Sequence, residues 1–186
     1  MERAAALLGP GDTVTVDGGT TTSMLASFIP DFPLRVITNS VRLVTALEAL
    51  HRDHPLLEIY VTGGLLYPHS GILLGPGAQA SVSQYHAQWA FLSAGGITDS
   101  HVFNTNELVV GTERAMIDGA EKVVVLADHS KIGKHSLCAV VSVENIDILI
   151  TDEHPENDEA LRRIEDLGVQ VIKVKAKPHN QLAVAS

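Results

Sequence analysis

Short runs of β-branched and other apolar residues alternate along the chain with amphipathic stretches. The strands that we expect from the apolar runs are 13–17, 34–38, 57–62, 88–94, 122–127, 146–151 and 169–174. The helices that we expect from the amphipathic stretches are 21–29, 41–51, 76–86, 107–120 and 156–167. This alternation predicts an α/β fold, namely a mostly parallel open sheet with helices on both faces.

The composition indicates one folded domain. A chain of 186 residues, 45% of them hydrophobic, can form one substantial core and is too short for two ordinary domains. We therefore expect a domain over residues 1–175 and a frayed tail at 176–186. The formal net charge of -9 argues against direct nucleic-acid binding by this polypeptide, because binding to a phosphate backbone depends on clustered Lys and Arg.

Cys138 is the only cysteine, which excludes an intrachain disulfide and a cysteine-based metal cage. The sequence has no basic leader, and its apolar runs are far shorter than the roughly 20 residues of a membrane helix, so we expect a soluble cytoplasmic protein with no membrane contact. His51 and His54 have helical spacing but no further ligand near in sequence, and we interpret them as surface residues. We expect no metal and no cofactor.

Polar residues and glycines collect where the predicted strands end. The clusters are Asp17 to Thr22, Thr38 to Ser40, Thr62 to Gly64, Ser93 to Gly96, Asp128 to Lys131, and Thr151 with Asp152. In an open α/β sheet the carboxyl ends of parallel strands share one edge, and ligands bind in the crevice beside it. The six clusters therefore predict a binding site on this edge.

The stretch DGGTTT at 17–22 carries the strongest indication of an anion site. Glycine lets a backbone approach a phosphate closely, and exposed N–H groups and threonine hydroxyls supply donors. The alternative is a tight turn whose threonines cap a helix. The spacing of a Walker A loop is absent, and so is GxGxxG, which argues against a nucleotide site.

Two other clusters suit the same ligand. In TNS at 38–40, Asn39 or Ser40 can cap the following helix and can also hydrogen-bond a sugar hydroxyl. In DHSK at 128–131, Lys131 is a natural charge partner for a phosphate, although the stretch also reads as a solvated loop.

Several conspicuous residues have simpler interpretations. Asn104, Asn106, Glu107 and Glu113 surround the start of the predicted helix at 107–120, where caps and first-turn acids are expected from the helix dipole alone. We assign Trp89 and Phe91, which alternate with small residues, to core or interface packing.

Taken together, DGGTTT, VITNS, VTGGLLYPHSGILLGPGA, FLSAGGI, TERAMIDGA and VVVLADHSKIGK resemble the effector-sensing domain of DeoR-family bacterial transcription regulators. The resemblance covers about residues 1–175, and the ordered set is far more specific than any single motif. In that family a small winged helix-turn-helix precedes this domain. ERAAALL, just before Gly9, has the look of the last turns of a helix, so we expect the DNA-reading portion to be absent from this chain.

The family's fold is similar to ribose-5-phosphate isomerase and glucosamine-6-phosphate deaminase, and its usual ligands are phosphorylated sugars or their derivatives. The residues that the resemblance implies for the binding site are Asp17, Gly18, Gly19, Thr20, Thr21, Thr22, Thr38, Asn39, Ser40, Gly63, Gly64, Gly95, Gly96 and Lys131. One departure stands out, because many members carry a basic residue before RAMI and this chain has Glu113.

A sensor and an enzyme need different residues at the carboxyl edge of the sheet. An isomerase needs a carboxylate within hydrogen-bond reach of the proton that it moves, whereas the loop SAGGI at 93–97 offers only backbone donors. We therefore expect a non-catalytic sensor in a homo-oligomeric regulator, a repressor whose operator binding shifts with the effector. The alternatives are a sugar-phosphate isomerase or deaminase-like enzyme that uses Asp17, Asp99, Glu107 or Asp128, and a nucleotide-binding switch.

Overall fold

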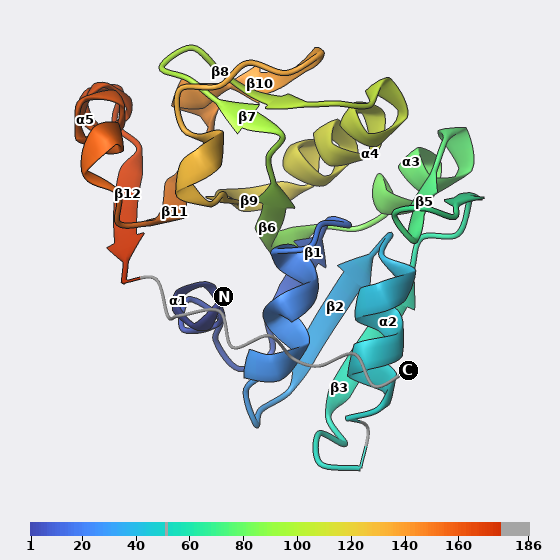
Figure 1. The fold of residues 1–186 in the computed structure, drawn as a ribbon. Helices are drawn as coiled ribbons and strands as arrows, with labels where there is room; N and C mark the ends of the chain where they lie inside the picture. The colour runs from blue at the N-terminus through green and yellow to red at the C-terminus, as the bar shows by residue number, and fades with distance from the viewer. Residues whose placement is uncertain (51, 176–186) are drawn as a thin grey trace, which may run out of the picture.

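A seven-stranded parallel sheet forms the centre of the molecule in the computed structural model, which describes residues 1–50 and 52–175 (Figure 1). Its strands are β1 (Thr13–Val16), β2 (Leu34–Thr38), β3 (Leu57–Val61), β6 (Ala87–Ser93), β9 (Ala120–Leu126), β11 (Ile148–Asp152) and β12 (Gln170–Val174). The order across the sheet is β12-β11-β9-β6-β1-β2-β3, and every neighbouring pair is parallel. All seven strands coincide with predicted apolar runs, so the predicted fold class is confirmed.

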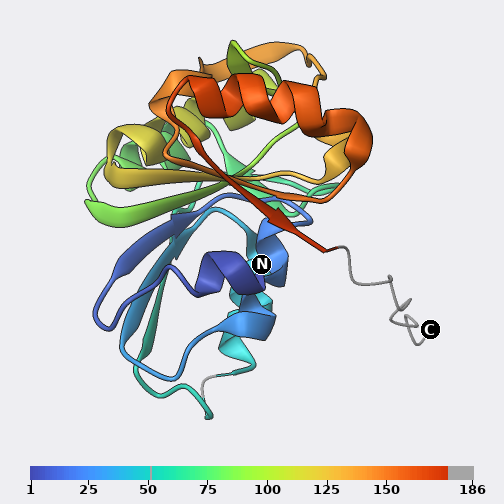
Figure 2. The same cartoon turned by 90° about the vertical axis from the view of Figure 1, so that its left-hand side faces the viewer.

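Helices cover both faces of this sheet, as predicted. The α-helices are α1 (Glu2–Ala5), α2 (Val41–Glu48), α3 (Pro76–Val82), α4 (Glu107–Asp118) and α5 (Asp158–Asp166), and the 3-10 helices are η1 (Thr22–Phe28), η2 (His129–Lys131), η3 (Val143–Asn145) and η4 (Pro155–Asn157). Figure 2 shows α5 on one side of the strands and α1 on the other.

Strand alternation divides the core into two apolar clusters, one on each face. On β9, Val123 and Val125 join the cluster under α3, α4 and α5, whereas Val124 and Leu126 join the cluster under α1, η1 and α2. Phe91 on β6 is fully buried in the second cluster, which confirms its predicted packing role. Because successive side chains of a strand point to opposite faces, a run that is apolar throughout is needed for a sheet buried on both sides.

Two small antiparallel sheets were not predicted. A hairpin of β4 (Leu65–Tyr67) and β5 (Ile72–Leu74) follows β3, and a three-stranded sheet is formed by β10 (Cys138–Ser142), β8 (His101–Asn104) and β7 (Gly96–Ile97). Figure 1 shows the second sheet above the carboxyl end of β6. These strands have two to five residues, too few for their alternation to be distinguished from loop sequence.

Some predicted boundaries need correction. The helix expected at 21–29 is the 3-10 helix η1, and the one expected at 41–51 ends at Glu48, with His51 outside the described residues. The predicted tail at 176–186 also lies outside them. In the part of the chain that the structure describes, no helix is long and apolar enough to cross a membrane.

Candidate functional site

A cavity of about 330 Å³ opens at the carboxyl ends of β1 and β6. These two strands are neighbours at the centre of the sheet, where the strand order changes direction. The connections on either side of such a point leave in opposite directions, so a crevice forms there and is the usual ligand site of open α/β sheets. The lining residues are Gly18, Gly19, Thr20, Thr21, Tyr67, Ser70, Ile72, Ser93, Ala94, Gly95, Asn104, Thr105, Asn106, Val109, Leu126, Ala127, Asp128 and Lys131.

The loop at 18–21 forms one wall with an open backbone. Gly18 and Thr20 make no hydrogen bond to any residue that the structure describes, which leaves their N–H groups available to a ligand. A Cβ atom at Gly18 would lie 2.5 Å from Cγ1 of Ile72, and one at Gly19 would lie 2.5 Å from Oγ of Ser93. The side chains of Ile72 and Ser93 therefore leave no room for a larger residue at either glycine unless they move.

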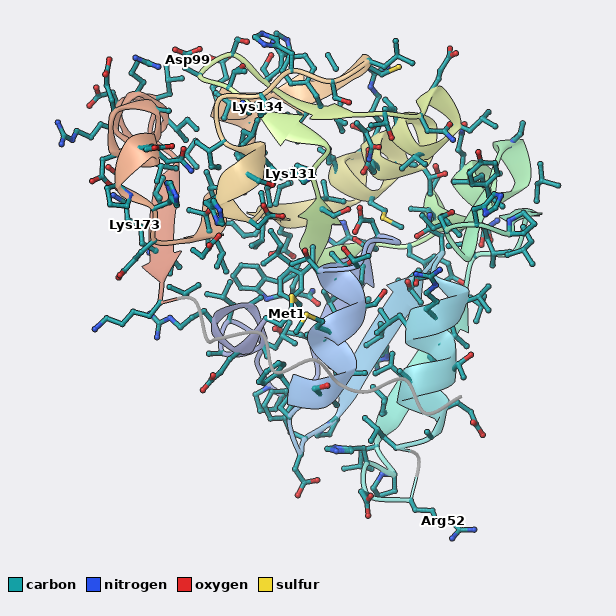
Figure 3. The ribbon with its side chains drawn as sticks, in the orientation of Figure 1. Met1, Arg52, Asp99, Lys131, Lys134 and Lys173 are labelled. Carbon is teal, nitrogen blue, oxygen red and sulfur yellow. The ribbon has the colours of Figure 1, made fainter. Side chains whose placement is uncertain are left out.

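Lys131 contributes a cation to the wall formed by η2 (Figure 3). Among the described residues its ammonium group has no hydrogen bond or ion pair, so it is available to an anion. Asp128 caps η2 by accepting a hydrogen bond from the backbone N–H of Ser130, at 2.9 Å. Partial burial acts to raise the pKa of Asp128, but hydrogen bonds from Ser130 and the charge of Lys131 outweigh it and lower the pKa.

The opposite wall comes from residues that were not predicted to bind. Asn104 ends β8, Thr105 follows it, Asn106 caps α4, and Tyr67 and Ser70 belong to the hairpin. The predicted capping role of Asn106 is confirmed, because its Oδ1 accepts a hydrogen bond from the N–H of Leu108 at 2.9 Å. Capping and cavity lining coexist here, since the cap residue lies at the cavity edge.

Six of the fourteen predicted site residues line this cavity, namely Gly18, Gly19, Thr20, Thr21, Gly95 and Lys131. Asp17 and Thr22 lie behind the loop, where both are buried. Oγ1 of Thr22 accepts a hydrogen bond from the N–H of Gly19 at 2.8 Å, so this hydroxyl holds the loop together. Asp17 and Thr22 therefore support the loop, and only four residues of the predicted stretch face the open space.

The predicted contacts from the 38–40 cluster are not found at the cavity. Thr38 donates to the carbonyl of Val16 at 2.7 Å, Asn39 donates to the carbonyl of Leu73 at 3.3 Å, and Ser40 caps α2. All three side chains are buried: Thr38 joins β2 to β1, Asn39 joins it to the hairpin, and Ser40 holds the start of α2. The structure thus places the three residues outside the cavity lining, where their side chains make hydrogen bonds within the fold.

Gly63, Gly64 and Gly96 also lie outside the cavity lining. Gly63 and Gly64 have φ angles of 68° and 107° at the entry to the hairpin, a region that disfavours residues with a side chain. A Cβ atom at Gly96 would lie 2.4 Å from the carbonyl oxygen of Lys134. These glycines are explained by turn geometry and close packing.

Beneath the cavity floor, Asp17 and Glu113 form a buried pair of carboxyl groups, each 1% exposed. Burial raises the pKa of Glu113 well above its ordinary value, and the negative charge of Asp17 raises it further. Burial also raises the pKa of Asp17, although hydrogen bonds from Ser93 oppose this shift. The interpretation of Glu113 as an acid near the helix start was wrong, since it lies in the middle of α4 and faces inward.

Three of the four acids considered for catalysis do not line the cavity. Asp99 is exposed and pairs with Arg163 at 3.0 Å, and Glu107 is exposed on α4. Of the four acids considered, Asp128 alone lines the cavity. Among the residues that the structure describes, no cluster of three or more His, Cys, Asp or Glu side chains could hold a metal ion.

A second hollow, of about 520 Å³, lies at the edge of the molecule and contains three cationic residues, Arg3, Lys173 and Lys175. Lys173 is committed to Asp158, with Nζ 2.6 Å from Oδ1. Figure 3 shows Lys173 at the periphery, whereas Lys131 lies in the middle of the molecule. The position of the central cavity at the strand reversal makes it the better candidate for a specific site.

The parallel sheet thus presents an open glycine loop, a lysine and several hydroxyl and amide groups in one cavity at its strand reversal. Residues 2–153 match the family described as the DeoR C terminal sensor domain. The chain therefore belongs to this family, as its motifs predicted.

Curated relatives are transcriptional regulators. The chain is 35% identical over 152 residues to the HTH-type transcriptional repressor GlcR of Bacillus subtilis, covering 82% of this chain and 57% of the relative. It is 30% identical over 171 residues to the HTH-type transcriptional regulator UlaR of Shigella dysenteriae, covering 92% and 66%. The chain thus spans less than two thirds of the length of these relatives. The prediction that the chain is the sensor domain of a DeoR-type regulator is confirmed.

Two solved structures align with part of the chain. Ribose 5-phosphate isomerase A from Methanocaldococcus jannaschii aligns with a TM-score of 0.46 and 15% identity, covering 70% of this chain and 50% of that chain. A translation initiation factor eIF-2B from Pyrococcus horikoshii aligns with a TM-score of 0.49 and 14% identity, covering 78% and 58%.

Proposed function

We propose that the central cavity binds a phosphorylated sugar or sugar derivative, and that this effector controls operator binding by a helix-turn-helix domain of the complete regulator. The observation that carries the proposal is that the open loop at 18–21 and Lys131 line the same cavity. Free backbone N–H groups, threonine hydroxyls and an unpaired ammonium group form a donor set suited to a phosphate.

The remainder of the cavity suits a sugar. Asp128 offers a carboxylate acceptor, and Ser70, Ser93 and Asn106 offer groups that hydrogen-bond hydroxyls. The volume of about 330 Å³ lies at the lower end of the range for small-molecule pockets. Size and polarity together favour one phosphorylated monosaccharide over a dinucleotide.

A thermal-shift screen of sugar phosphates against the corresponding free sugars tests this proposal. A ligand at about 100 times its dissociation constant stabilises the folded state by about 2.7 kcal/mol, and the melting temperature rises by roughly 2–4 °C per kcal/mol in a domain of this size. We expect stabilisation by at least one sugar phosphate and little by its free sugar. Equal stabilisation by both would contradict the phosphate assignment, and a larger shift with ATP or NAD would favour a nucleotide-binding switch.

The effector acts by shifting an equilibrium between arrangements of the regulator with different operator affinity. A ligand shifts such an equilibrium only by its differential affinity for the two states. We propose repression that the effector relieves, with support from the name of the relative GlcR. Operator affinity of the complete protein that is the same with and without every stabilising sugar phosphate would contradict this mechanism.

The proposal includes a homo-oligomer, because a symmetric operator is matched by a symmetric protein. The hairpin exposes Leu65, Leu66 and Tyr67, and the adjacent edge strand β3 exposes Val61. These apolar side chains lie beside the cavity wall to which Tyr67 belongs, so subunit contact here would reach the site. A monomer mass from light scattering at micromolar concentration would count against this part.

A further inference from the structure

The buried carboxyl pair beneath the cavity has a hydrogen-bonding pattern that requires a proton. Oδ1 of Asp17 and Oε2 of Glu113 are both buried, and neither has a hydrogen-bond partner of good geometry among the described residues, although Thr22 lies close enough to Asp17 to help lower its pKa. The two carboxyl groups are close enough to shift each other's pKa, and a proton between them would give both atoms a partner. Two ionised carboxylates cannot form a hydrogen bond to each other, because each would only accept.

The other oxygen of each carboxyl group is held by a residue that lines the cavity. Oδ2 of Asp17 accepts hydrogen bonds from the N–H of Ser93 at 3.0 Å and from its Oγ at 2.8 Å. Oε1 of Glu113 accepts from Nδ2 of Asn104 at 2.7 Å. The pair therefore connects two parts of the cavity lining, one at the end of β6 and one at the end of β8.

We propose that Asp17 and Glu113 share one proton, which resides on Glu113, and that an effector anion binds with this proton in place. The shared proton depends only on the buried contacts. The coupling to the effector rests on the proposed function of the cavity. In this arrangement Glu113 is a positioning residue that acts through Asn104 and Asp17.

Electrostatics explains why the proton and the anion are linked. Burial and the charge of Asp17 raise the pKa of Glu113 far above its ordinary value of 4.5, while the hydrogen bond from Glu113 acts to lower the pKa of Asp17. With the proton present, the pair carries one negative charge. Loss of the proton places a second negative charge near the bound anion, and the resulting repulsion reduces the affinity for the anion.

Other charged groups around the pair have different partners or positions. Asp128 and Lys131 face the cavity from η2. Arg114 on α4 turns outward and donates to the carbonyls of Ala139 and Val140. The titratable residues on the other strands packed against α4 are His101 on β8, Cys138 on β10, and Glu121 and Lys122 on β9. Because these titratable residues pack against the same helix, the test must isolate Glu113 by substitution.

The matched variant is Glu113→Gln, which keeps the shape of a protonated glutamic acid. Its amide can donate to Asp17 and accept from Asn104, and it has no proton to lose. Sulfate is the probe, because it remains a dianion from about pH 5 to about pH 9, whereas phosphate itself titrates in this range. We expect parent and variant to bind sulfate equally at low pH. The parent alone should then weaken, by up to about tenfold per pH unit above the folded pKa of Glu113.

Calorimetric titration of sulfate in two buffers with different ionisation heats measures the number of protons taken up on binding. We expect proton uptake on binding at pH values near and above the folded pKa of Glu113, and none in Glu113→Gln. Sulfate binding that follows the same pH profile in parent and variant, without proton uptake, would overturn the coupling and leave the proposed function intact. Absence of sulfate binding by the parent at every pH would overturn the proposed function and the coupling together.

Thermal unfolding tests the shared proton without any ligand. The folded state keeps a proton that the unfolded chain loses above about pH 4.5, so the stability associated with protonated Glu113 is complete below that value and declines as the pH rises to the folded pKa. The melting temperature of Glu113→Gln should therefore rise relative to the parent by several degrees over this window. A constant difference between the two proteins would overturn the shared proton.

Discussion

Replacing Thr21 by glutamate is expected to weaken sugar-phosphate binding severely and to leave the fold in place. The side chain of Thr21 makes no hydrogen bond to a described residue, and it faces the open cavity, so the new carboxylate remains hydrated in the free protein. Two unit charges about 4 Å apart repel by about 4 kcal/mol at an effective dielectric constant of about 20. Affinity should fall by more than about a hundredfold, as measured by isothermal titration calorimetry.

Thr45→Glu is the matched control for this variant. Thr45 is exposed on α2 and does not line the cavity, so the substitution adds the same charge elsewhere. The control should bind like the parent, and both variants should melt within a few degrees of it. Retained affinity in Thr21→Glu would place the phosphate away from the 18–21 loop.

The second large effect is expected for Lys131→Met, which removes the cation and keeps a long apolar side chain. A hydrogen bond to a charged group contributes about 1.5–3 kcal/mol, so the dissociation constant should increase by roughly ten- to more than a hundredfold. Titration calorimetry with the same sugar phosphate measures this change. The free sugar should bind both proteins alike, because its contacts do not involve the missing charge.

Lys134→Met controls for the general loss of positive charge. Lys134 is exposed three residues further along and is not part of the cavity lining. Its replacement should change the affinity less than about twofold, since exposed charges are screened by solvent and salt. Equal losses in the two variants would mean that Lys131 acts only through net charge.

The sheet could be predicted from the sequence because its strands are buried on both faces. Runs such as VVVL at 123–126 are apolar at every position, which is typical of a strand buried on both faces. A polar cluster follows such a run and marks the edge of the sheet. The order of the strands could not be read from the sequence. Parallel pairing leaves no local turn signal, since each crossover is long.

Site residues within one short sequence motif could be predicted. Those that reach the cavity only through tertiary folding were missed. The residue types of Gly18, Gly19 and Lys131 are enough to indicate an anion site. Tyr67 and Ser70, in contrast, reach the cavity only because of the way the hairpin folds. Thr38 and Asn39 have the polarity of ligand contacts, but the fold uses their side chains for its own hydrogen bonds. Polarity at a strand end thus does not distinguish a ligand contact from a structural one.

The burial of Glu113 could have been predicted from its position in the sequence. Its position lies on the same helical stripe as Val109 and Met116, both buried on α4. An acid on an apolar stripe predicts a buried carboxyl group with a dedicated partner. That the partner is another acid, Asp17, depends on how α4 packs against β6 and β9, which only the three-dimensional structure reveals.

A crystal structure with the best sugar phosphate from the thermal-shift screen tests the central claim most directly. The account predicts the phosphate group against the backbone of residues 18–21, within hydrogen-bond distance of Lys131, and the sugar toward Asn106 and Asp128. A phosphate bound instead at the peripheral hollow beside Arg3 and Lys173, with the central cavity empty, would contradict it.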